Sequence, residues 1–510
     1  MSQSRRPNIL VFMSDQHSRH FVGCYGNRII RTPNLDRLAA EGMRFDNAYC
    51  PAPLCVPSRM SFMTCRTPTR NRVWNNLGCL NSGIPTWAHV LGLSGYETLL
   101  FGRMHFNGPD QHHGLEHRPV GHVHSTHYGV PLPGAKMWGK IDGGACGQLR
   151  IAVEAAGVGQ ANYKYLDDQA TSAACDWLRG QGRQGGRPFA AVVGTMLPHC
   201  PFIAPKSLYD YYFERADLPT IEASQPESIQ RFRRTRDILR PLSDHQVRVA
   251  RAAYYALCEY ADSAVGRVLE ALAAGGLDRD TLVIYTSDHG EAAGEHGCWW
   301  KSNYYEASAG VPLIARLPGV VQSGSVQPAI CNLMDIGATL VDVAGPPSDA
   351  VTASGATACN DADAGGFPCP VDGRSLWPML QGNAAIWPNE TFSELVDFRS
   401  GRFATRMIRR DQWKLWVSDG GAGRPADMAM FNLDKDPGEL TDLSGDPAVA
   451  DIRTDLLARL YDGWSPADAL AACELNRTDM QFLARHGRAF KPRHPCAPTL
   501  PEGYEEFEQR

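Results

Sequence analysis

Four short runs of consecutive apolar residues stand out along the chain, each bounded by polar or turn-forming residues. They span Asn8 to Ser14, Glu97 to Phe101, Phe189 to Leu197 and Thr281 to Ser287. Continuous apolar runs of this length are typical of strands buried on both faces of a parallel sheet. Because helical patterns lie between them, at 33–41, 168–178 and 244–273, the chain is predicted to be an α/β protein with a large, mostly parallel sheet between helices.

The later part of the chain has a different pattern. Residues 402–417 and 428–433 predict strands of a smaller antiparallel sheet, and a helix is expected near 447–462. Residues 345–370 are rich in Ala, Gly, Asp, Ser and Pro without periodicity, which indicates a flexible insertion. We therefore expect a catalytic domain at 1–344, a linker at 345–371 and a C-terminal subdomain at 372–510. The end, 492–510, is either an arm that docks on a neighbour or a frayed tail.

Composition narrows the class of protein. A net charge of -5, with both signs interspersed among 510 residues, gives no reason to expect binding to nucleic acid or to an anionic membrane. No apolar run is long enough to cross a bilayer, and the N-terminus does not read as a secretory signal. The 15 cysteines are odd in number and form no C-x-x-C pair, so we expect a reducing, cytoplasmic location.

Polar residues follow each of the four predicted strands. Ligands of open α/β sheets bind outside the carboxyl ends of the strands, so these residues are expected to converge. Two carboxylates and an imidazole suit one divalent cation, with Ca, Mg or Mn favoured by the oxygen donors and a transition metal by the imidazole. The residues concerned are Asp15, His105, His199, Asp288 and His289, and the expected metal ligands among them are Asp15, Asp288 and His289.

A Pro-rich loop delivers Cys55 to the predicted start of a helix, with Pro57 in its first turn and Arg59 four residues on. A helix N-terminus and a nearby cation both favour an anion at that point. Two interpretations remain open from the residues alone: a buried structural thiol or a nucleophile that acts on an anion.

Two further groups of residues deserve a functional hypothesis. Lys301 and His296 lie downstream of Asp288, and Lys301 is flanked by aromatic residues; it either extends along apolar surface or binds an anion. Six histidines crowd residues 112–127, where a loop at the rim of a pocket is a better interpretation than a second metal site.

The residues resemble the type I sulfatases of the alkaline phosphatase superfamily. Cys55-Val56-Pro57-Ser58-Arg59 matches their Cys-x-Pro-Ser-Arg signature, and the resemblance covers nearly the whole chain in order. Further matching segments are Pro7–Leu10 with Asp15, Thr32–Asp36, Gly95–Thr98, Gly102–His105, Pro198–Phe202, Ser287–Glu291 with Lys301, Val311–Ile314 and Phe431–Glu439.

The resemblance implies an alkaline-phosphatase-like fold and a sulfuric ester hydrolase. Cys55 would be oxidised by a separate maturation enzyme to formylglycine, whose hydrate attacks sulfur with one hydroxyl and expels sulfate with the other. By the same likeness, Asp15, Asp288, His289 and the modified Cys55 would bind one divalent metal. Arg59 would orient formylglycine, His105 would act as the base, and His199 and Lys301 would bind sulfate and protonate the leaving oxygen.

Departures from the common arylsulfatase pattern point to particular branches. Arg103 stands where a lysine is usual and keeps the charge with different geometry. Gln16 and His289 resemble the choline-sulfatase and phosphonate-monoester-hydrolase branches, which makes manganese an alternative to calcium. The choline-sulfatase likeness adds Asn76 and Glu394 as substrate-binding candidates beside Arg103 and His296, and suggests a cation–π wall of Trp74, Trp138 or Trp300.

Two alternatives to a sulfatase acting on an aryl or choline-type sulfate ester stay open. One is a phosphonate monoester or phosphodiester hydrolase with the same nucleophile and metal. The other is a non-catalytic protein that binds sulfo-anions with an unmodified Cys55. We also expect a homo-oligomer.

Overall fold

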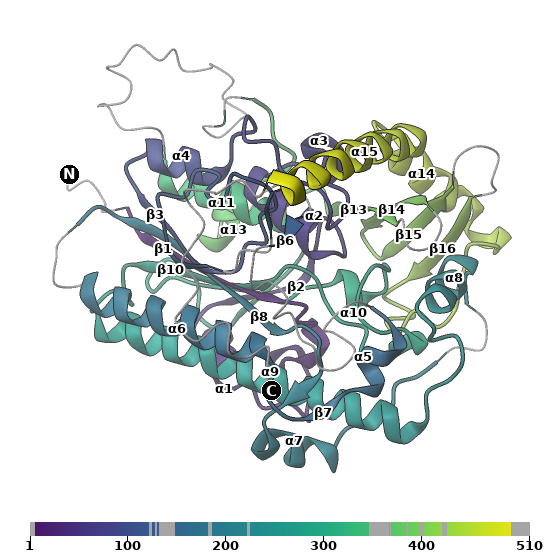
Figure 1. The fold of residues 1–510 in the computed structure, drawn as a ribbon, viewed down its shortest axis with the longest axis horizontal. Coiled ribbons are helices and arrows are strands. Elements are labelled where there is room, and N and C mark those ends of the chain that lie inside the picture. The colour runs from purple at the N-terminus through teal and green to yellow at the C-terminus, as the bar shows by residue number, and fades with distance from the viewer. Residues whose placement is uncertain are drawn as a thin grey trace.

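An eight-stranded sheet lies at the centre of the computed structural model (Figure 1). The strand order is β12-β2-β11-β10-β1-β8-β3-β4, and β11 alone runs antiparallel to its neighbours. The bounds are β1 Asn8–Asp15, β2 Met43–Tyr49, β3 Glu97–Gly102, β4 His117–Gly121, β8 Phe189–Pro198, β10 Thr281–Ser287, β11 Leu313–Arg316 and β12 Ser325–Asn332. The structure describes residues 6–121, 125–127, 130–131, 148–181, 186–221, 225–345, 367, 369–383, 386–397, 402–420 and 426–490.

Alternate residues of the central strands face two separate cores. In β1, Ile9, Val11 and Met13 pack into one core while Leu10 and Phe12 pack into the other, and all five are almost fully buried. Side chains of a strand point to opposite faces in turn, so a strand covered by helices on both faces must be apolar throughout. The four apolar runs of the sequence are β1, β3, β8 and β10, and the predicted fold class is confirmed.

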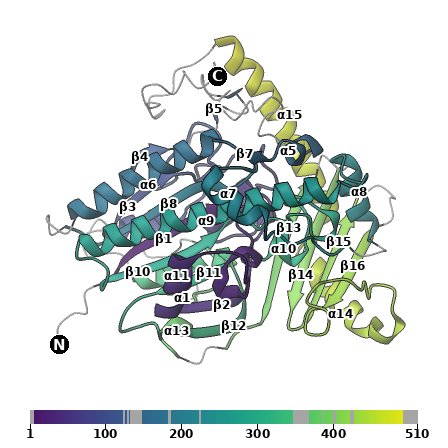
Figure 2. The ribbon, with the colours of Figure 1, turned by 90° about the horizontal axis from the view of Figure 1, so that it is seen from below.

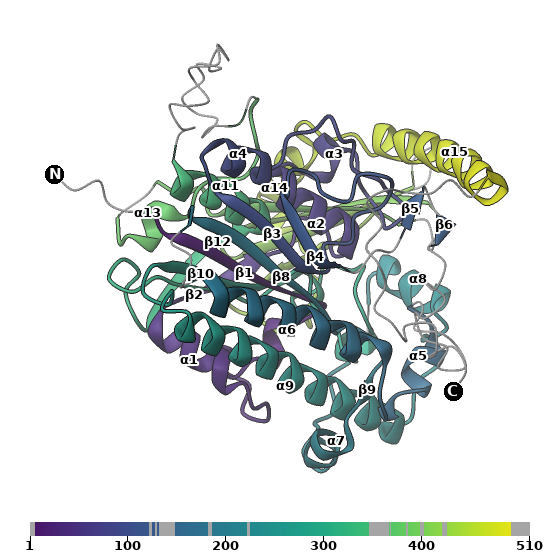
Figure 3. The ribbon, with the colours of Figure 1, turned by 60° about the vertical axis from the view of Figure 1, so that its left-hand side comes forward.

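Helices cover both faces of the sheet (Figures 1 and 3). The long helices α6 and α9 lie side by side on one face with α1, and α2, α4 and α11 lie on the other. Ser243 caps α9, accepting from the Gln246 N–H, while the Gln246 side chain accepts from the Ser243 N–H. The bounds are α1 Pro33–Glu41, α2 Cys55–Thr64, α4 Trp87–Leu93, α6 Asn162–Gln181, α9 Asp244–Ala274 and α11 Leu333–Ala344.

Short elements make the connections around this core. They include two small two-stranded sheets, β5–β6 and β7–β9. Their bounds are η1 Arg19–Phe21, η2 Gly23–Tyr25, α3 Pro68–Asn71, β5 Ser125–His127, β6 Val130–Pro131, α5 Arg150–Glu154, β7 Gly157–Val158, β9 Ile203–Ala204, α7 Lys206–Phe213, α8 Glu227–Thr235, η4 Glu295–Gly297, α10 Glu306–Ala309 and α13 Trp377–Leu380.

A second, antiparallel sheet follows in the order β13-β14-β15-β16 and packs its own core against α14 and α15 (Figure 2). The predicted segment 402–417 contains β14 and β15, which turn at Asp411, and 428–433 falls on β16. β13 and the long α15 were not predicted from the sequence. The bounds are β13 Glu390–Asp397, β14 Phe403–Arg410, β15 Trp413–Asp419, β16 Asp427–Asn432, η6 Pro447–Val449, α14 Ala450–Tyr461 and α15 Pro466–Phe490. The predicted tail 492–510 and most of the predicted linker lie outside the described residues.

A buried ion cluster connects the second sheet to the first. Lys414 of β15 donates to Glu306 of α10 at 2.7 Å and also pairs with Glu439. Arg19 pairs with Glu306 from the other side, and Tyr49 of β2 donates to the same carboxylate at 3.1 Å. Because charges in a low-dielectric interior are costly unless paired, this cluster fixes the position of the small sheet. Among the described helices, none is both long and apolar enough to span a bilayer.

Candidate active site

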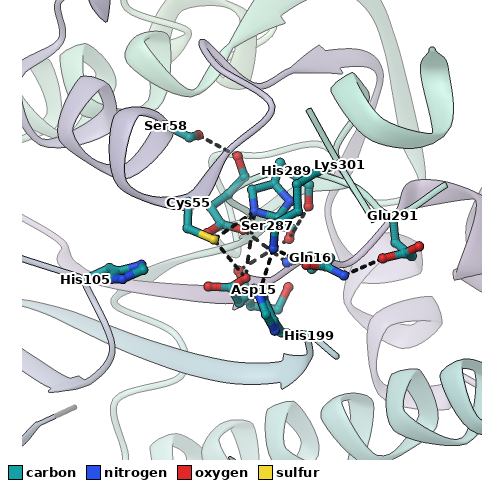
Figure 4. A network of polar contacts seen from close by, with 12 residues as sticks. Asp15, Gln16, Cys55, Ser58, His105, His199, Ser287, His289, Glu291 and Lys301 are labelled. Atoms are coloured by element: carbon teal, nitrogen blue, oxygen red, sulfur yellow. Dashed lines mark hydrogen bonds and ion pairs between the residues drawn. The ribbon is translucent and has the colours of Figure 1, made fainter. Parts of the chain in front are cut away.

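The site forms where strand ends and a helix start meet. Asp15 is the last residue of β1, and Asp288 and His289 follow β10. These two strands are parallel neighbours, with Ser14 paired to Ser287, so their carboxyl ends lie at the same edge of the sheet. Cys55 is the first residue of α2 and lies opposite them (Figure 4). The convergence expected from the sequence is therefore present.

Four buried donors come together here. One ligand atom each from Asp15, Cys55, Asp288 and His289 lies within 4.8 Å of the others, and all four residues are buried. Cys55 Sγ is 3.2 Å from His289 Nε2 and 3.6 Å from Asp15 Oδ1, while His289 Nε2 is 3.6 Å from Asp288 Oδ1. Two carboxylates and an imidazole at this spacing have the donor chemistry of a divalent-cation site.

Arg59 determines which carboxylate oxygens face that centre. Its guanidinium is fully buried and donates from Nε to Asp288 Oδ2 at 2.7 Å and from Nη2 to Asp15 Oδ2 at 3.1 Å. The contacts to Cys55 and His289 are made by the other oxygens, Oδ1 of each aspartate. One arginine thus orients both carboxylates, and the two Oδ1 atoms are directed to a common point.

Arg103 and His105 approach from the end of β3. Arg103 Nε is 2.6 Å from Asp15 Oδ2, and its Nη2 is 2.7 Å from His105 Nδ1. The chain can reach this position because two glycines lie opposite each other: Gly102, at φ +87°, is paired with Gly194 of β8. A Cβ on Gly194 would lie 1.9 Å from the Arg103 carbonyl oxygen, so only glycine fits there.

Lys301, His199 and Gln16 form a second polar group next to the donors (Figure 4). Lys301 Nζ lies 2.7 Å from His199 Nε2 and also donates to the side-chain oxygen of Gln16. The Gln16 amide in turn donates to Glu291, whose other oxygen accepts from the backbone N–H groups of Ala293 and Trp300 at 2.8 and 2.6 Å. Gln16 therefore links a buried carboxylate to the ammonium group at the site.

The electrostatics of the site favour negative charge at its centre. Burial raises the pKa of the Cys55 thiol, but the charges of Lys301 and His289 outweigh it and hold this pKa well below its usual range. Burial likewise opposes ionisation of Asp15, yet the Arg103 guanidinium keeps the pKa of that carboxyl below its usual range. For Asp288, burial prevails and raises the pKa. The site therefore stabilises an anion at position 55.

The other candidates from the sequence lie in different surroundings. Asn76 is close to the nucleophile, since its side-chain oxygen accepts from the Val56 N–H at 2.9 Å. The Glu394 carboxylate is buried and accepts from the Thr69 N–H and hydroxyl at 3.0 and 2.6 Å. His296 stacks on Tyr305 with ring centroids 3.6 Å apart. Roles for Glu394 and His296 in binding substrate remain predictions.

The expected aromatic wall and the His-rich segment also have definite surroundings. Trp74 is buried in the core of the second sheet, and Trp300, which precedes Lys301, is fully buried; Trp138 lies outside the described residues. Within the described part, His112 and His113 contact neighbours in their own loop, at Leu115 O and Asp110. Among the described residues, the group that could hold a metal ion consists of Asp15, Cys55, Asp288 and His289, and it contains none of these histidines.

A hollow of about 200 Å³ lies next to the loop that carries the nucleophile. Leu54, which precedes Cys55, and Ser302, which follows Lys301, line one side, and Arg236 and Asp397 line the other. Neither Arg236 nor Asp397 was a candidate from the sequence. The only local signal was that Asp397 ends a strand, which is weak evidence because the strand itself was overlooked.

A large, mostly parallel sheet flanked by helices, with a buried Asp-Asp-His group at its carboxyl edge and a cysteine at a helix start, defines a hydrolase of the alkaline phosphatase superfamily. The sulfatase family model matches residues 7–346. The chain therefore belongs to the sulfatase family, and the protein is a sulfatase.

Individual relatives agree with this assignment. The chain is 32% identical over 460 residues to a choline-sulfatase of Rhizobium meliloti (strain 1021), covering 87% of this chain and 83% of the relative. It is 27% identical over 465 residues to arylsulfatase K of Bos taurus, covering 86% and 78%. The fold is similar to that of the phosphonate monoester hydrolase of Agrobacterium radiobacter, with a TM-score of 0.69, 23% identity and coverage of 90% and 95%.

Proposed function

We propose that the protein hydrolyses a sulfate monoester to an alcohol and inorganic sulfate, using formylglycine made from Cys55 and one divalent cation. The observation that carries this proposal is the position of Cys55. Its side chain lies in contact with His289 and Asp15, within the donor cluster that also includes Asp288. A nucleophile placed there would meet a sulfate group held by the same cluster.

The donor set fits a cation. Asp15, Asp288, His289 and the side chain at position 55 would hold it, because Arg59 leaves Oδ1 of each aspartate directed to the shared point. Such an ion would supply Lewis-acid polarisation of the sulfate group and would favour the ionised form of the nucleophile. Hard oxygen donors favour Ca, Mn or Mg, and His289 favours Mn among these.

Position 55 also fits the modification. A formylglycine hydrate supplies two hydroxyls on one carbon, one to attack sulfur and one whose deprotonation releases sulfate and restores the aldehyde. This divides one difficult hydrolysis into two easier steps. The modification requires a maturation enzyme as a partner, and the Cys55-Val56-Pro57-Ser58-Arg59 motif supports that requirement.

The surrounding residues would share the remaining work. Lys301 and His199 would bind the sulfate oxygens and provide the proton for the leaving alcohol. His105, held by Arg103 at 2.7 Å, would accept a proton from the group at position 55. Arg59 would hold the carboxylates and the charge that develops in the transition state.

We further propose a cytoplasmic location and a homo-oligomer. The twelve cysteines among the described residues are all free thiols, and free thiols persist in a reducing compartment. Size-exclusion chromatography with light scattering would test the oligomeric state.

Two measurements test the function. Peptide mass spectrometry across residues 51–59, on protein from its native host, should show the aldehyde at position 55, and Cys55→Ala should abolish turnover of 4-nitrophenyl sulfate. In parallel, kcat/KM should be highest for sulfate esters within a panel that includes a phosphonate monoester and a phosphodiester. A phosphonate preference would assign the protein to the alternative reaction, and an unmodified cysteine without turnover would indicate a binding protein.

A further inference from the structure

The wall of the hollow beside Cys55 combines an ion pair with amide and hydroxyl groups. Six separate segments converge there, and its polar residues include Asn76, Gln148, Arg236 and Asp397, with Ser302 at the edge. Ser302 is fixed to the nucleophile loop, since its N–H donates to Pro53 O at 2.9 Å. These groups therefore lie beside the loop that carries Cys55, on a side that the alcohol portion of a bound sulfate ester can reach.

The Arg236 side chain is buried and is fixed by contacts with Phe232 and Gln148. Its side chain is 2% exposed, its guanidinium lies 3.9 Å from the centre of the Phe232 ring, and its Nε donates to Gln148 Oε1 at 3.1 Å. The same Gln148 oxygen accepts from the Ser302 hydroxyl at 3.3 Å. A guanidinium fixed in this way presents donors in a set direction, with little entropy left to lose on binding.

Asp397 faces this guanidinium without closing onto it. The nearest atoms, Arg236 Nη2 and Asp397 Oδ2, are 3.7 Å apart, which is longer than a hydrogen bond. A hydroxyl group that both donates and accepts can bridge such a pair, giving its proton to the carboxylate and accepting from the guanidinium. Two adjacent hydroxyls can do this at once, as in a sugar.

The lining disfavours a quaternary ammonium alcohol. Recognition of such cations uses the faces of aromatic rings, and none of the described residues that line the hollow is aromatic. The apolar side chains of Leu54 and Leu395 can pack against the C–H groups on the face of a sugar ring.

The space continues past Asp397. A second, much smaller hollow of about 30 Å³ shares Ser302, Leu395 and Asp397 with the first, and Tyr304 and Trp416 lie in its wall. Asn303 also lines it; this residue is 4% exposed, and its side-chain N–H₂ has no hydrogen-bond partner among the described residues. An unpaired buried donor in a hollow of this size is suited to one small acceptor, such as a water molecule or a single hydroxyl group.

We propose that the substrate is a carbohydrate sulfate, and that Arg236 and Asp397 determine this specificity by binding hydroxyl groups of the sugar that carries the ester. This inference rests on the proposed sulfatase reaction at Cys55. It makes Asp397 a specificity residue on the alcohol side, separate from the groups that bind sulfate.

The test is a substrate panel on the metal-loaded, formylglycine-containing enzyme. The substrates are sulfated monosaccharides and disaccharides, choline sulfate and 4-nitrophenyl sulfate. Wild-type enzyme should prefer a sugar sulfate to choline sulfate. In Asp397→Asn, the ratio of kcat/KM for that sugar sulfate to kcat/KM for 4-nitrophenyl sulfate should fall roughly tenfold to a hundredfold, as expected for loss of a charged hydrogen bond. Asp210→Asn, on the exposed face of α7, is the matched control and should leave the ratio unchanged.

The possible results separate the two proposals. If 4-nitrophenyl sulfate is cleaved but choline sulfate is preferred to every sugar sulfate, the specificity inference is wrong and the sulfatase reaction stands. If Asp397→Asn lowers all substrates equally, the Arg236–Asp397 pair is structural and the inference is also wrong. If enzyme with a verified aldehyde cleaves no sulfate ester, the proposed sulfatase reaction is wrong, and the specificity inference that rests on it is wrong as well.

Discussion

Lys301 Nζ lies 2.7 Å from His199 Nε2, while His199 Nδ1 lies 2.5 Å from the Cys200 carbonyl oxygen. Two positive groups do not approach this closely, so the contact is a hydrogen bond in which the ammonium donates to the imidazole. The Nδ1–H of His199 then donates to the carbonyl. In the proposed mechanism this pair would pass a proton towards the substrate.

This arrangement predicts that Lys301→Ala and His199→Asn lose more activity on poor leaving groups than on good ones. An alkyl alcohol needs a proton to leave, whereas 4-nitrophenolate hardly does. We expect kcat/KM for an alkyl or sugar sulfate to fall roughly a hundredfold to ten-thousandfold, and for 4-nitrophenyl sulfate by less. Lys206→Ala, on the exposed face of α7, is the control, and an equal loss on both substrates would contradict proton donation.

Metal removal should inactivate the enzyme and lower its thermal stability. Without a cation the two buried carboxylates lose a shared counter-charge at their Oδ1 atoms, so the Tm should fall and activity should drop at least about a hundredfold. The measurements are kinetics and differential scanning calorimetry after dialysis against EDTA, with Ca, Mn or Mg added back. Asp288→Asn should reproduce the loss and Asp278→Asn, at the other end of β10, should not. Full activity in metal-free protein would exclude the proposed cation.

The ion cluster around Glu306 predicts acid sensitivity of the folded state. Burial opposes ionisation of Glu306, but Lys414 and Arg19 prevail and hold its pKa below the usual value. A carboxyl whose pKa is lowered on folding stabilises the protein above its unfolded pKa of 4.5, and this contribution is lost as the pH falls below that value. Glu306→Gln should cost about 3 kcal/mol near pH 7 and flatten this part of the pH dependence.

Urea unfolding between pH 3 and 7 measures this effect. Glu214→Gln, on the surface next to Arg215, is the control and should follow the wild type at every pH. A Glu306→Gln variant as stable as the wild type at pH 7 would show that the cluster does not hold the two sheets together.

Gly194→Ala should disturb the site through the backbone. The added methyl would meet the Arg103 carbonyl oxygen at 1.9 Å, so β3 and β8 must separate at their carboxyl ends. We expect a loss of about 2 kcal/mol in unfolding free energy and reduced kcat through the displaced Arg103. Gly180→Ala in α6, where nothing lies within 4 Å, should instead stabilise by roughly 0.5–1 kcal/mol. Equal effects of the two substitutions would contradict the close approach.

Much of the fold and of the site is encoded locally. The four apolar runs predicted β1, β3, β8 and β10, because a strand buried on both faces has no polar positions. Asp15, Asp288 and His289 were expected to converge, because the ends of parallel strands share one edge. The strand β13 was overlooked because its buried Ser393 and Glu394 are polar, and their burial depends on partners such as Thr69, more than 300 residues away in sequence.

The sequence by itself determined which residues surround Cys55, since strand patterns and a helix start are short-range properties. Only the tertiary structure decided how they are oriented: Arg59 turns Oδ1 of both aspartates to one point, and Gln16 connects Lys301 to Glu291. It also decided which residues line the hollow proposed for the alcohol portion of the substrate, where Arg236 and Asp397 face each other. Those two residues come from a helix end and a strand end about 160 positions apart in the printed sequence, and no local pattern records a contact made by packing alone.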